Sequence, residues 1–312
     1  MDSGEPQSEA PAEVPAASPS RRVRLDIRYD GTGFSGWARQ PGLRTVQGEL
    51  EAALAVVFRR AGQPPTLTVA GRTDVGVHAT GQVAHVDLTD AQLRILDRRD
   101  RGGRPGPSGP SALARRLNGI AGLESDVRVA SSDFAPPGFD ARFSATWRRY
   151  EYRIADAEAA QDPRRRLHTL WLPAALDVVA MHEAARSLLG LHDFATFCRP
   201  RPGATTIREL QEFSWERDDH GVLIARLQAD AFCRSMVRAL VGACVAVGGG
   251  KLTAARAVEL RDGVRRRSEF VVMPAKGLTM TEVGYPPDAE LASRAELTRA
   301  RRVGLPDSQG ID

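Results

Sequence analysis

The stretch from Val69 to Asp87 reads V-A-G-R-T-D-V-G-V-H-A-T-G-Q-V-A-H-V-D. It leaves an apolar run, turns through Gly71-Arg72-Thr73-Asp74 and re-enters an extended segment at Gln82, which predicts a strand, a loop and a second strand. A neighbouring guanidinium keeps a carboxylate ionised, and an ionised, positioned aspartate can act as a nucleophile, a base or a cation ligand. For an arbitrary R-T-D triplet, however, an aspartate that caps a turn beside a surface arginine is the more common structure.

Length and composition are those of a soluble globular protein of 312 residues, long enough for two ordinary domains with cores of their own. No run of apolar residues is long enough to cross a bilayer, and no segment typical of a signal peptide follows the start. The three cysteines lack the spacing of a metal site, so we expect neither a disulfide framework nor a zinc site, and a reducing cytoplasm fits best. They are Cys198, Cys233 and Cys244.

The cations are almost all arginines, and Lys251 and Lys276 are the only lysines. Arginine is suited to phosphate contacts and to stacking on bases. Four clusters are candidate contacts to an RNA backbone, although a short charge run is more often a solvated surface. The clusters are Arg21-Arg22, Arg148-Arg149, Arg164-Arg165-Arg166 and Arg265-Arg266-Arg267.

A strand with one solvated face is predicted from residue 23 to residue 30, where apolar and charged side chains alternate. Gly31, Gly33 and Gly36 then spell G-x-G-x-x-G. The dinucleotide-binding fingerprint of this form must open a helix at once, whereas here a loop follows and helix begins only near Thr45. We therefore reject a dinucleotide-dependent enzyme, a reading that rests on these glycines alone.

Apolar periodicity predicts the remaining elements. Thr45 can cap a helix with an apolar face of Val46, Leu50, Leu54, Val57 and Phe58. Residues 88–110 become charged and rich in Gly and Pro, which indicates a flexible surface insertion. We further expect helices capped by Ser111 and Asp177, a loop carrying His192-Asp193-Phe194, helices over Phe232–Cys244 and Thr253–Arg261, and strands near Val127, 146–154, Ile207–Trp215, Val222–Ala229 and Leu278–Val283.

These elements predict an α+β fold of two similar α/β subdomains. Each is expected to be a mainly antiparallel sheet with helices on one side. The predicted boundaries are a disordered tail over 1–20, an N-terminal subdomain over 21–141, a C-terminal subdomain over 142–287 and a polar tail over 288–312.

Separated motifs resemble the tRNA pseudouridine synthase A family over roughly residues 23–287. The quoted loop matches G-R-T-D-x-G-V-H-A-x-G-Q-V, and the glycine-rich segment before it matches Y-D-G-x-x-F-x-G-W-x-x-Q. The later matches are F-D-A-R-F-S-A-x-x-R-R-Y-x-Y, A-F-x-x-x-M-V-R-x-L-V-G and G-L-x-x-x-x-V-x-Y-P. Matches of this length are far more specific than a three-residue motif.

The resemblance implies that the two sheets are continuous, with a basic RNA-binding cleft between the subdomains. It also implies a cytoplasmic tRNA pseudouridine synthase. Such an isomerase flips uridines out at positions 38, 39 and 40 of the anticodon stem-loop, needs no cofactor or metal, and forms a homodimer. It further implies Asp74 as the nucleophile that attacks C1′ or C6, with Arg72 in the space left by the flipped base. Arg238 pairs with Asp74, Tyr150 stacks on the uracil and Met280 lies beneath it.

Each assignment has a simpler alternative. Tyr150 can be an ordinary aromatic residue of a sheet, Arg238 a surface arginine, and His78 is a structural hydrogen-bonding residue rather than a metal ligand. The competing function is a non-catalytic tRNA-binding or RNA-chaperone protein on the same fold. The intact Arg72-Thr73-Asp74 triplet, Tyr150 and Arg238 argue against it.

Overall fold

One sheet runs through the whole protein in the computed structural model, which describes residues 20–97, 108–201, 205–263 and 269–303. Its strands are β1 (Ser20–Tyr29), β2 (Thr68–Val69), β3 (His78–Thr89), β4 (Val127–Phe134), β5 (Trp147–Ala155), β6 (Leu170–Trp171), β7 (Gly190–Asp193), β8 (Ile207–Arg217), β9 (Leu223–Ala229) and β10 (Leu278–Gly284). They follow the order β4-β1-β3-β10-β5-β9-β8-β7, with β2 paired to β3 and β6 to β5. The predicted α+β class and the continuous sheet are confirmed.

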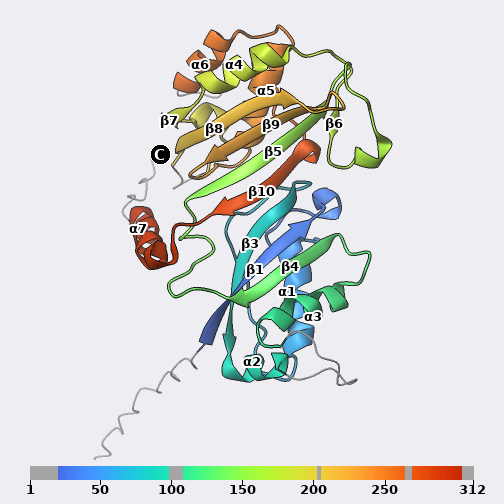
Figure 1. The fold of residues 1–312 in the computed structure, drawn as a ribbon. Coiled ribbons are helices and arrows are strands. Elements are labelled where there is room, and N and C mark those ends of the chain that lie inside the picture. Colours follow the sequence, from blue (N-terminus) through green and yellow to red (C-terminus); the bar gives the residue numbers. More distant parts are fainter. Residues whose placement is uncertain (1–19, 98–107, 202–204, 264–268, 304–312) are drawn as a thin grey trace, which may run out of the picture.

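Helices cover the sheet in two groups, one for each half (Figure 1). They are α1 (Val46–Phe58), α2 (Asp90–Leu96), α3 (Ser111–Ala121), α4 (Val178–Ser187), α5 (Met236–Gly248), α6 (Ala254–Asp262) and α7 (Leu291–Val303). In the first half, α3 packs on β4 and on α1; in the second, α4 packs on β8 and on α5. The core therefore lies between the sheet and these helices.

Local sequence explains where several helices begin. The hydroxyl oxygens of Thr45 and Thr253 accept hydrogen bonds from the first turns of α1 and α6, and the carboxylate of Asp177 does the same for α4. Each side chain satisfies a backbone N–H that the helix itself leaves unpaired. The expected start of α1 at Thr45 is confirmed, and a short 3-10 helix, Gly31–Gly33, rather than an α-helix follows β1.

The two halves meet where β3 runs parallel to β10, which Figure 1 shows as the teal and orange-red strands between β1 and β5. The pairing is short: Thr279 lies opposite His78, and Met280 lies opposite Ala79. Beyond it the register of β10 against β5 shifts at Thr281, whose carbonyl packs directly against Gly81. The sheet is continuous at this point because residue 81 has no side chain.

Two segments predicted to be irregular are helices. The predicted insertion of 88–110 contains α2, because Thr89 and Gln92 form a capping box and Leu96 is buried. The predicted polar tail contains α7, because Leu291 and Ala295 are buried against the body of the protein. The expectations for 98–107 and for residues 1–19 lie outside the described residues.

Three smaller expectations were wrong. Ser111 is the first residue of α3 and does not cap it, since its hydroxyl donates to the Ser108 carbonyl instead. His192 and Asp193 belong to β7, where they pair with β8, rather than to a loop. The first strand begins at Ser20, before the predicted start at residue 23.

Candidate active site

A network of buried hydroxyl and amide groups holds the loop that carries Asp74. Thr73 Oγ1 and Tyr29 Oη share a hydrogen bond of 2.8 Å. The side-chain amide of Gln82, at 0% exposure, donates to Tyr29 Oη at 3.2 Å and to the Gly71 carbonyl at 2.9 Å. Two strands, β1 and β3, therefore hold the residues on either side of Arg72, whose own side chain is exposed.

The glycine-rich segment after β1 supports the same loop through its backbone. Trp37 N donates to the Thr73 carbonyl at 3.1 Å, and the Phe34 carbonyl accepts from Gly76 N at 3.4 Å. Gly36 has a φ of +92° and lies so close to the Thr73 carbonyl that a side chain there would crowd it. The G-x-G-x-x-G motif, rejected above as a dinucleotide site, thus supports the loop that carries Asp74.

Asp74 lies between two guanidinium groups from the second half of the chain. Arg238 Nη1 is 3.9 Å from Asp74 Oδ2, and Arg234 Nε is 3.9 Å from Oδ1. Both separations are longer than an N–H···O hydrogen bond. The two cations therefore offset the charge of the carboxylate without occupying its oxygens, which stay open to a substrate. The Asp74 side chain is 34% exposed. It therefore lies at the junction of the two halves, accessible yet paired.

Arg238 is anchored as well as paired. Its Nε donates to the Met273 carbonyl at 2.6 Å, and its side chain is 22% exposed. It extends from the first turn of α5, whose apolar side packs in the core. This anchoring fixes a positive charge beside Asp74.

Tyr150 lies in the middle of β5, directly opposite Met280 of β10. Its ring is buried and meets the Phe232 ring edge to face, with centroids 5.1 Å apart. Met280 is completely buried, and its Cε lies 3.2 Å from where a Cβ on Gly71 would be. Met280 is thus packed under the Asp74 loop in this structure.

Arg148 joins the two halves beside this site. Its guanidinium donates to the carbonyls of Ala70, Arg142 and Asp230, at 3.0, 3.2 and 2.8 Å. Three carbonyls around one guanidinium make Arg148 an internal clamp on the residue before Gly71. It is therefore less suited to an RNA phosphate than the sequence suggested.

The other arginine clusters also have partners in the protein. Arg22 pairs with Asp87, and Arg149 pairs with Glu282. Arg164 pairs with Asp162. The cluster at 265–267 lies outside the described residues.

His78 is a structural residue, as predicted. Its Nδ1 accepts from Gly31 N at 3.0 Å, and its Nε2 lies 3.0 Å from the Lys276 carbonyl. The same nitrogen also lies 3.1 Å from the Asp30 carboxylate. The imidazole therefore connects the first half to the start of β10.

Burial raises the pKa of all four tyrosine hydroxyls above the ordinary value of 10, and that of Tyr29 to about 12. The others are Tyr150, Tyr152 and Tyr285. In the unfolded chain these groups lose protons near pH 10, while the folded protein keeps them. The contribution of these hydroxyls to the free energy of unfolding is therefore expected to be fully present below pH 10 and to decrease as the pH rises above it. Urea unfolding between about pH 8 and 11, with phenolate absorbance on the same samples, measures this; phenolate formation in the folded protein at pH 10 would contradict it.

No group of three or more His, Cys, Asp or Glu residues able to hold a metal ion occurs among the residues that the structure describes. Two cavities lie elsewhere, the larger of about 270 Å³, and neither is lined by Asp74, Tyr150 or Arg238. Within the described ranges, no helix is both long and apolar enough to span a membrane.

Two features of the site were missing from the sequence-based prediction. Arg234 reaches Asp74 as closely as Arg238 does, although it lies before the start of α5. Cys198 and Cys233 form a disulfide, with Cα atoms 5.6 Å apart. The expectation that the cysteines form no disulfide was therefore wrong, and cysteine usage no longer supports a reducing cytoplasm. These cysteines are 35 residues apart, and the fold alone brings them together. Cys244 is free and buried, as a core residue of α5.

Known proteins similar to this chain are tRNA-modifying enzymes by name. A family model described as tRNA pseudouridine synthase matches residues 184–286. The chain is 62% identical over 282 residues to the tRNA pseudouridine synthase A of Leifsonia xyli, covering 90% of this chain and 98% of that protein. It is 55% identical over 283 residues to the enzyme of the same name from Frankia casuarinae, covering 90% and 96%. An archaeal box H/ACA Nop10–Cbf5 complex matches at 9% identity and a TM-score of 0.29, over 88% of this chain and 55% of that one, a likeness too weak for any argument.

Proposed function

We infer that this chain, which belongs to the tRNA pseudouridine synthase A family, is an isomerase that converts uridine to pseudouridine in tRNA. One observation carries the inference: an aspartate in the family loop stands open to a substrate between two arginines of the other half of the chain. A protein that only bound RNA would gain nothing from a carboxylate directed at phosphates.

We assign the nucleophilic attack to Asp74. The target base must first leave its stack, at a cost of a few kcal/mol. Attack on C1′ or C6 precedes cleavage of the N1–C1′ bond. The uracil then turns and a C5–C1′ bond forms. The bond from Asp74 to C1′ or C6 breaks and releases the carboxylate, C5 loses its proton and N1 gains one. Atoms and charges balance without any cofactor.

The remaining roles follow from where the residues lie. Arg238, anchored to the Met273 carbonyl, keeps a positive charge beside Asp74 and holds the carboxylate in place. Arg72 is exposed on the same loop and free of the buried network, so it is suited to fill the space of the flipped base. Met280 is proposed to support the uracil from below once the base has entered.

Tyr150 is proposed to stack on the flipped uracil. Burial raises the pKa of its hydroxyl, so at neutral pH the phenol is protonated and can donate a hydrogen bond but cannot begin as a base. Tyr150→Ala is expected to raise KM for tRNA about 10- to 100-fold, because stacking contributes about 1–3 kcal/mol. Tyr150→Phe keeps the ring and is expected to keep KM within about twofold.

Steady-state kinetics on an anticodon stem-loop RNA measure both variants. Tyr285→Phe is the matched control, because it removes a buried hydroxyl that donates to the Ala141 carbonyl. A Tyr150→Ala enzyme with the KM of the unmodified protein would exclude contact between this ring and the base.

We further propose that the targets are uridines 38, 39 and 40 of the anticodon stem-loop, that the enzyme is a homodimer and that one tRNA contacts both subunits. Pseudouridine mapping of tRNA transcripts incubated with the purified protein tests the function directly. Modification at these positions is the expected result. Tight binding with no pseudouridine anywhere would favour the alternative, a non-catalytic tRNA-binding protein.

A further inference from the structure

A disulfide joins two segments that each carry an arginine, and one of these arginines is Arg234 beside Asp74. Cys198 directly follows the short 3-10 helix Ala195–Phe197, and Cys233 lies three residues before α5. Beside the disulfide, Arg199 N donates to the Arg234 carbonyl at 2.9 Å. A covalent bond and a backbone hydrogen bond therefore hold Cys233 and Arg234 against the segment that follows β7.

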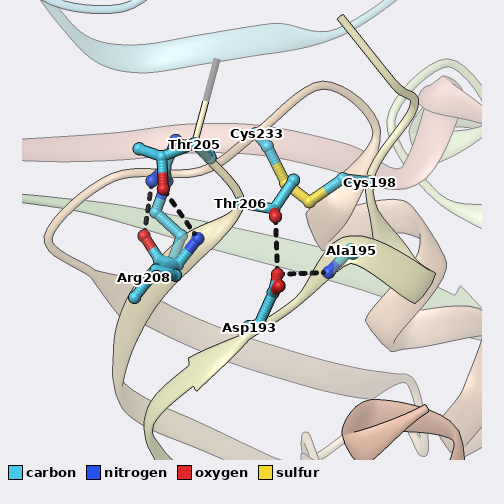
Figure 2. Close-up of a disulfide and its surroundings, with 8 residues drawn as sticks. Asp193, Ala195, Cys198, Thr205, Thr206, Arg208 and Cys233 are labelled. Atoms are coloured by element: carbon cyan, nitrogen blue, oxygen red, sulfur yellow. Dashed lines mark hydrogen bonds between the residues drawn. A yellow bond between two sulfur atoms is a disulfide. The ribbon is translucent and has the colours of Figure 1, made fainter. Parts of the chain in front are cut away.

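The segment on the Cys198 side is itself fixed, as Figure 2 shows. The Asp193 carboxylate accepts from Ala195 N at 3.0 Å and from the Thr206 hydroxyl at 2.5 Å. This places the start of β8, the end of β7 and the 3-10 helix in one connected unit. Cys233 is thus attached to a firm support rather than to a free loop.

The backbone next to Arg234 is strained. Ser235 has a φ of +65°, the sole positive φ of a non-glycine residue among the residues that the structure describes. A conformation of this kind costs about 1–2 kcal/mol and persists where the surroundings over-determine it. Here the fixed segment lies on one side and α5 on the other. The result is that Arg234 turns out of the helix direction and toward Asp74.

The two arginines beside Asp74 differ in what else they can reach. Arg238 is 22% exposed and donates to a backbone carbonyl, so it is committed to the protein. Arg234 is 58% exposed and lies 3.9 Å from the carboxylate, so most of its donors face outward. Arg199, which follows Cys198 in the segment on the other side of the disulfide, is exposed as well. A nucleophile that attacks a nucleoside must come close to the phosphates on either side of the sugar, and its own charge repels them.

We propose that Arg234 binds an RNA phosphate adjacent to the target uridine, and that the Cys198–Cys233 disulfide positions it for this contact. The proposal rests on the proposed function. The planar guanidinium matches the geometry of a phosphate through paired hydrogen bonds. Arg234 then lets a phosphate approach Asp74, whereas Arg238 remains paired with the carboxylate.

The first experiment compares Arg234→Ala and Arg234→Lys with Arg60→Ala, a matched loss of an exposed arginine just after α1. KM, kcat and the salt dependence of binding are measured on a stem-loop RNA. Arg234→Ala is expected to raise KM about tenfold and to lower the slope of log K against log salt by about one, with kcat much less affected. Lysine is expected to restore the salt slope and part of KM.

A KM and salt slope equal to those of the unmodified protein in Arg234→Ala would overturn the phosphate contact. That outcome requires an active unmodified protein, so it differs from failure of the proposed function, in which the unmodified protein forms no pseudouridine.

The second experiment tests positioning with a double-mutant cycle between Cys198→Ser and Arg234→Ala. Cys198→Ser is expected to raise KM about threefold when Arg234 is present and to leave it unchanged in the Arg234→Ala background. Treatment of the unmodified protein with dithiothreitol is expected to act as Cys198→Ser does. An equal rise of KM in both backgrounds would mean that the disulfide stabilises the fold generally, and would overturn the positioning role.

Discussion

Asp74→Asn is expected to lower the rate of tritium release from 5-tritiated uridine in tRNA by about 10⁴-fold or more, the scale on which loss of a nucleophile is measured in other enzymes. The amide has the shape of the carboxylate but neither its charge nor its nucleophilicity. Binding of tRNA is expected to persist or to tighten, because Arg234 and Arg238 lose their anionic partner while the RNA phosphates remain. Filter binding and tritium release on the same preparation separate the two effects.

Asp219→Asn is the matched control. Asp219 is an exposed aspartate in the turn between β8 and β9, so the same change of charge there is expected to leave both measurements as they are. Tritium release at the normal rate from Asp74→Asn would remove the assignment of the nucleophile. Loss of binding together with activity would instead indicate that the variant is misfolded, which circular dichroism checks.

The sequence predicted the site as far as local pattern and family motifs reach. The strand-loop-strand around Asp74 follows from alternation on either side of a glycine-rich turn, and the start of α1 follows from Thr45. The approach of Arg238 to Asp74 joins residues from different halves, so periodicity could not have given it; the resemblance of the two motifs did. Their arrangement in space agrees with that expectation.

What the sequence did not predict depends on tertiary structure. Nothing in the segment Cys233-Arg234-Ser235 signals a left-handed serine, and the disulfide next to it joins this segment to one 35 residues away in the sequence. The helix α2 did have a local signal, the Thr89-x-x-Gln92 capping box. The prediction of a flexible insertion gave more weight to the charged, glycine-rich residues that follow this capping box.

The helix α7 illustrates a weaker signal. Its two well-buried side chains, Leu291 and Ala295, are four residues apart, which is one turn of a helix. The residues around them are mostly polar, so the apolar stripe is too thin to distinguish a docked helix from a tail. Packing against the body of the protein, and the ion pair of Arg299 with buried Asp140, determine the outcome.

Gly81→Ala is expected to destabilise the protein by about 3 kcal/mol or more, at the upper end of the range for overpacking. The φ of Gly81 is not in the left-handed region, so the cost does not come from backbone conformation. It comes from space, because a Cβ would overlap the Thr281 carbonyl, and β3 must move away from β10. The two strands share only a short stretch of pairing, so no neighbouring bonds can absorb the shift.

Gly119→Ala provides the contrast that makes this prediction decisive. Gly119 lies within α3 with open space where its Cβ would be, so alanine there is expected to stabilise the helix by about 0.5–1 kcal/mol. Urea unfolding of both variants measures the two signs. A folded fraction of Gly81→Ala is also expected to react slowly, because β10 carries Met280 under the Asp74 loop and a displacement of about 1 Å at a catalytic group costs about 100-fold in rate. Equal stability of the two variants would mean that the junction of β3 and β10 does not determine how the halves, and therefore Asp74 and its two arginines, are held together.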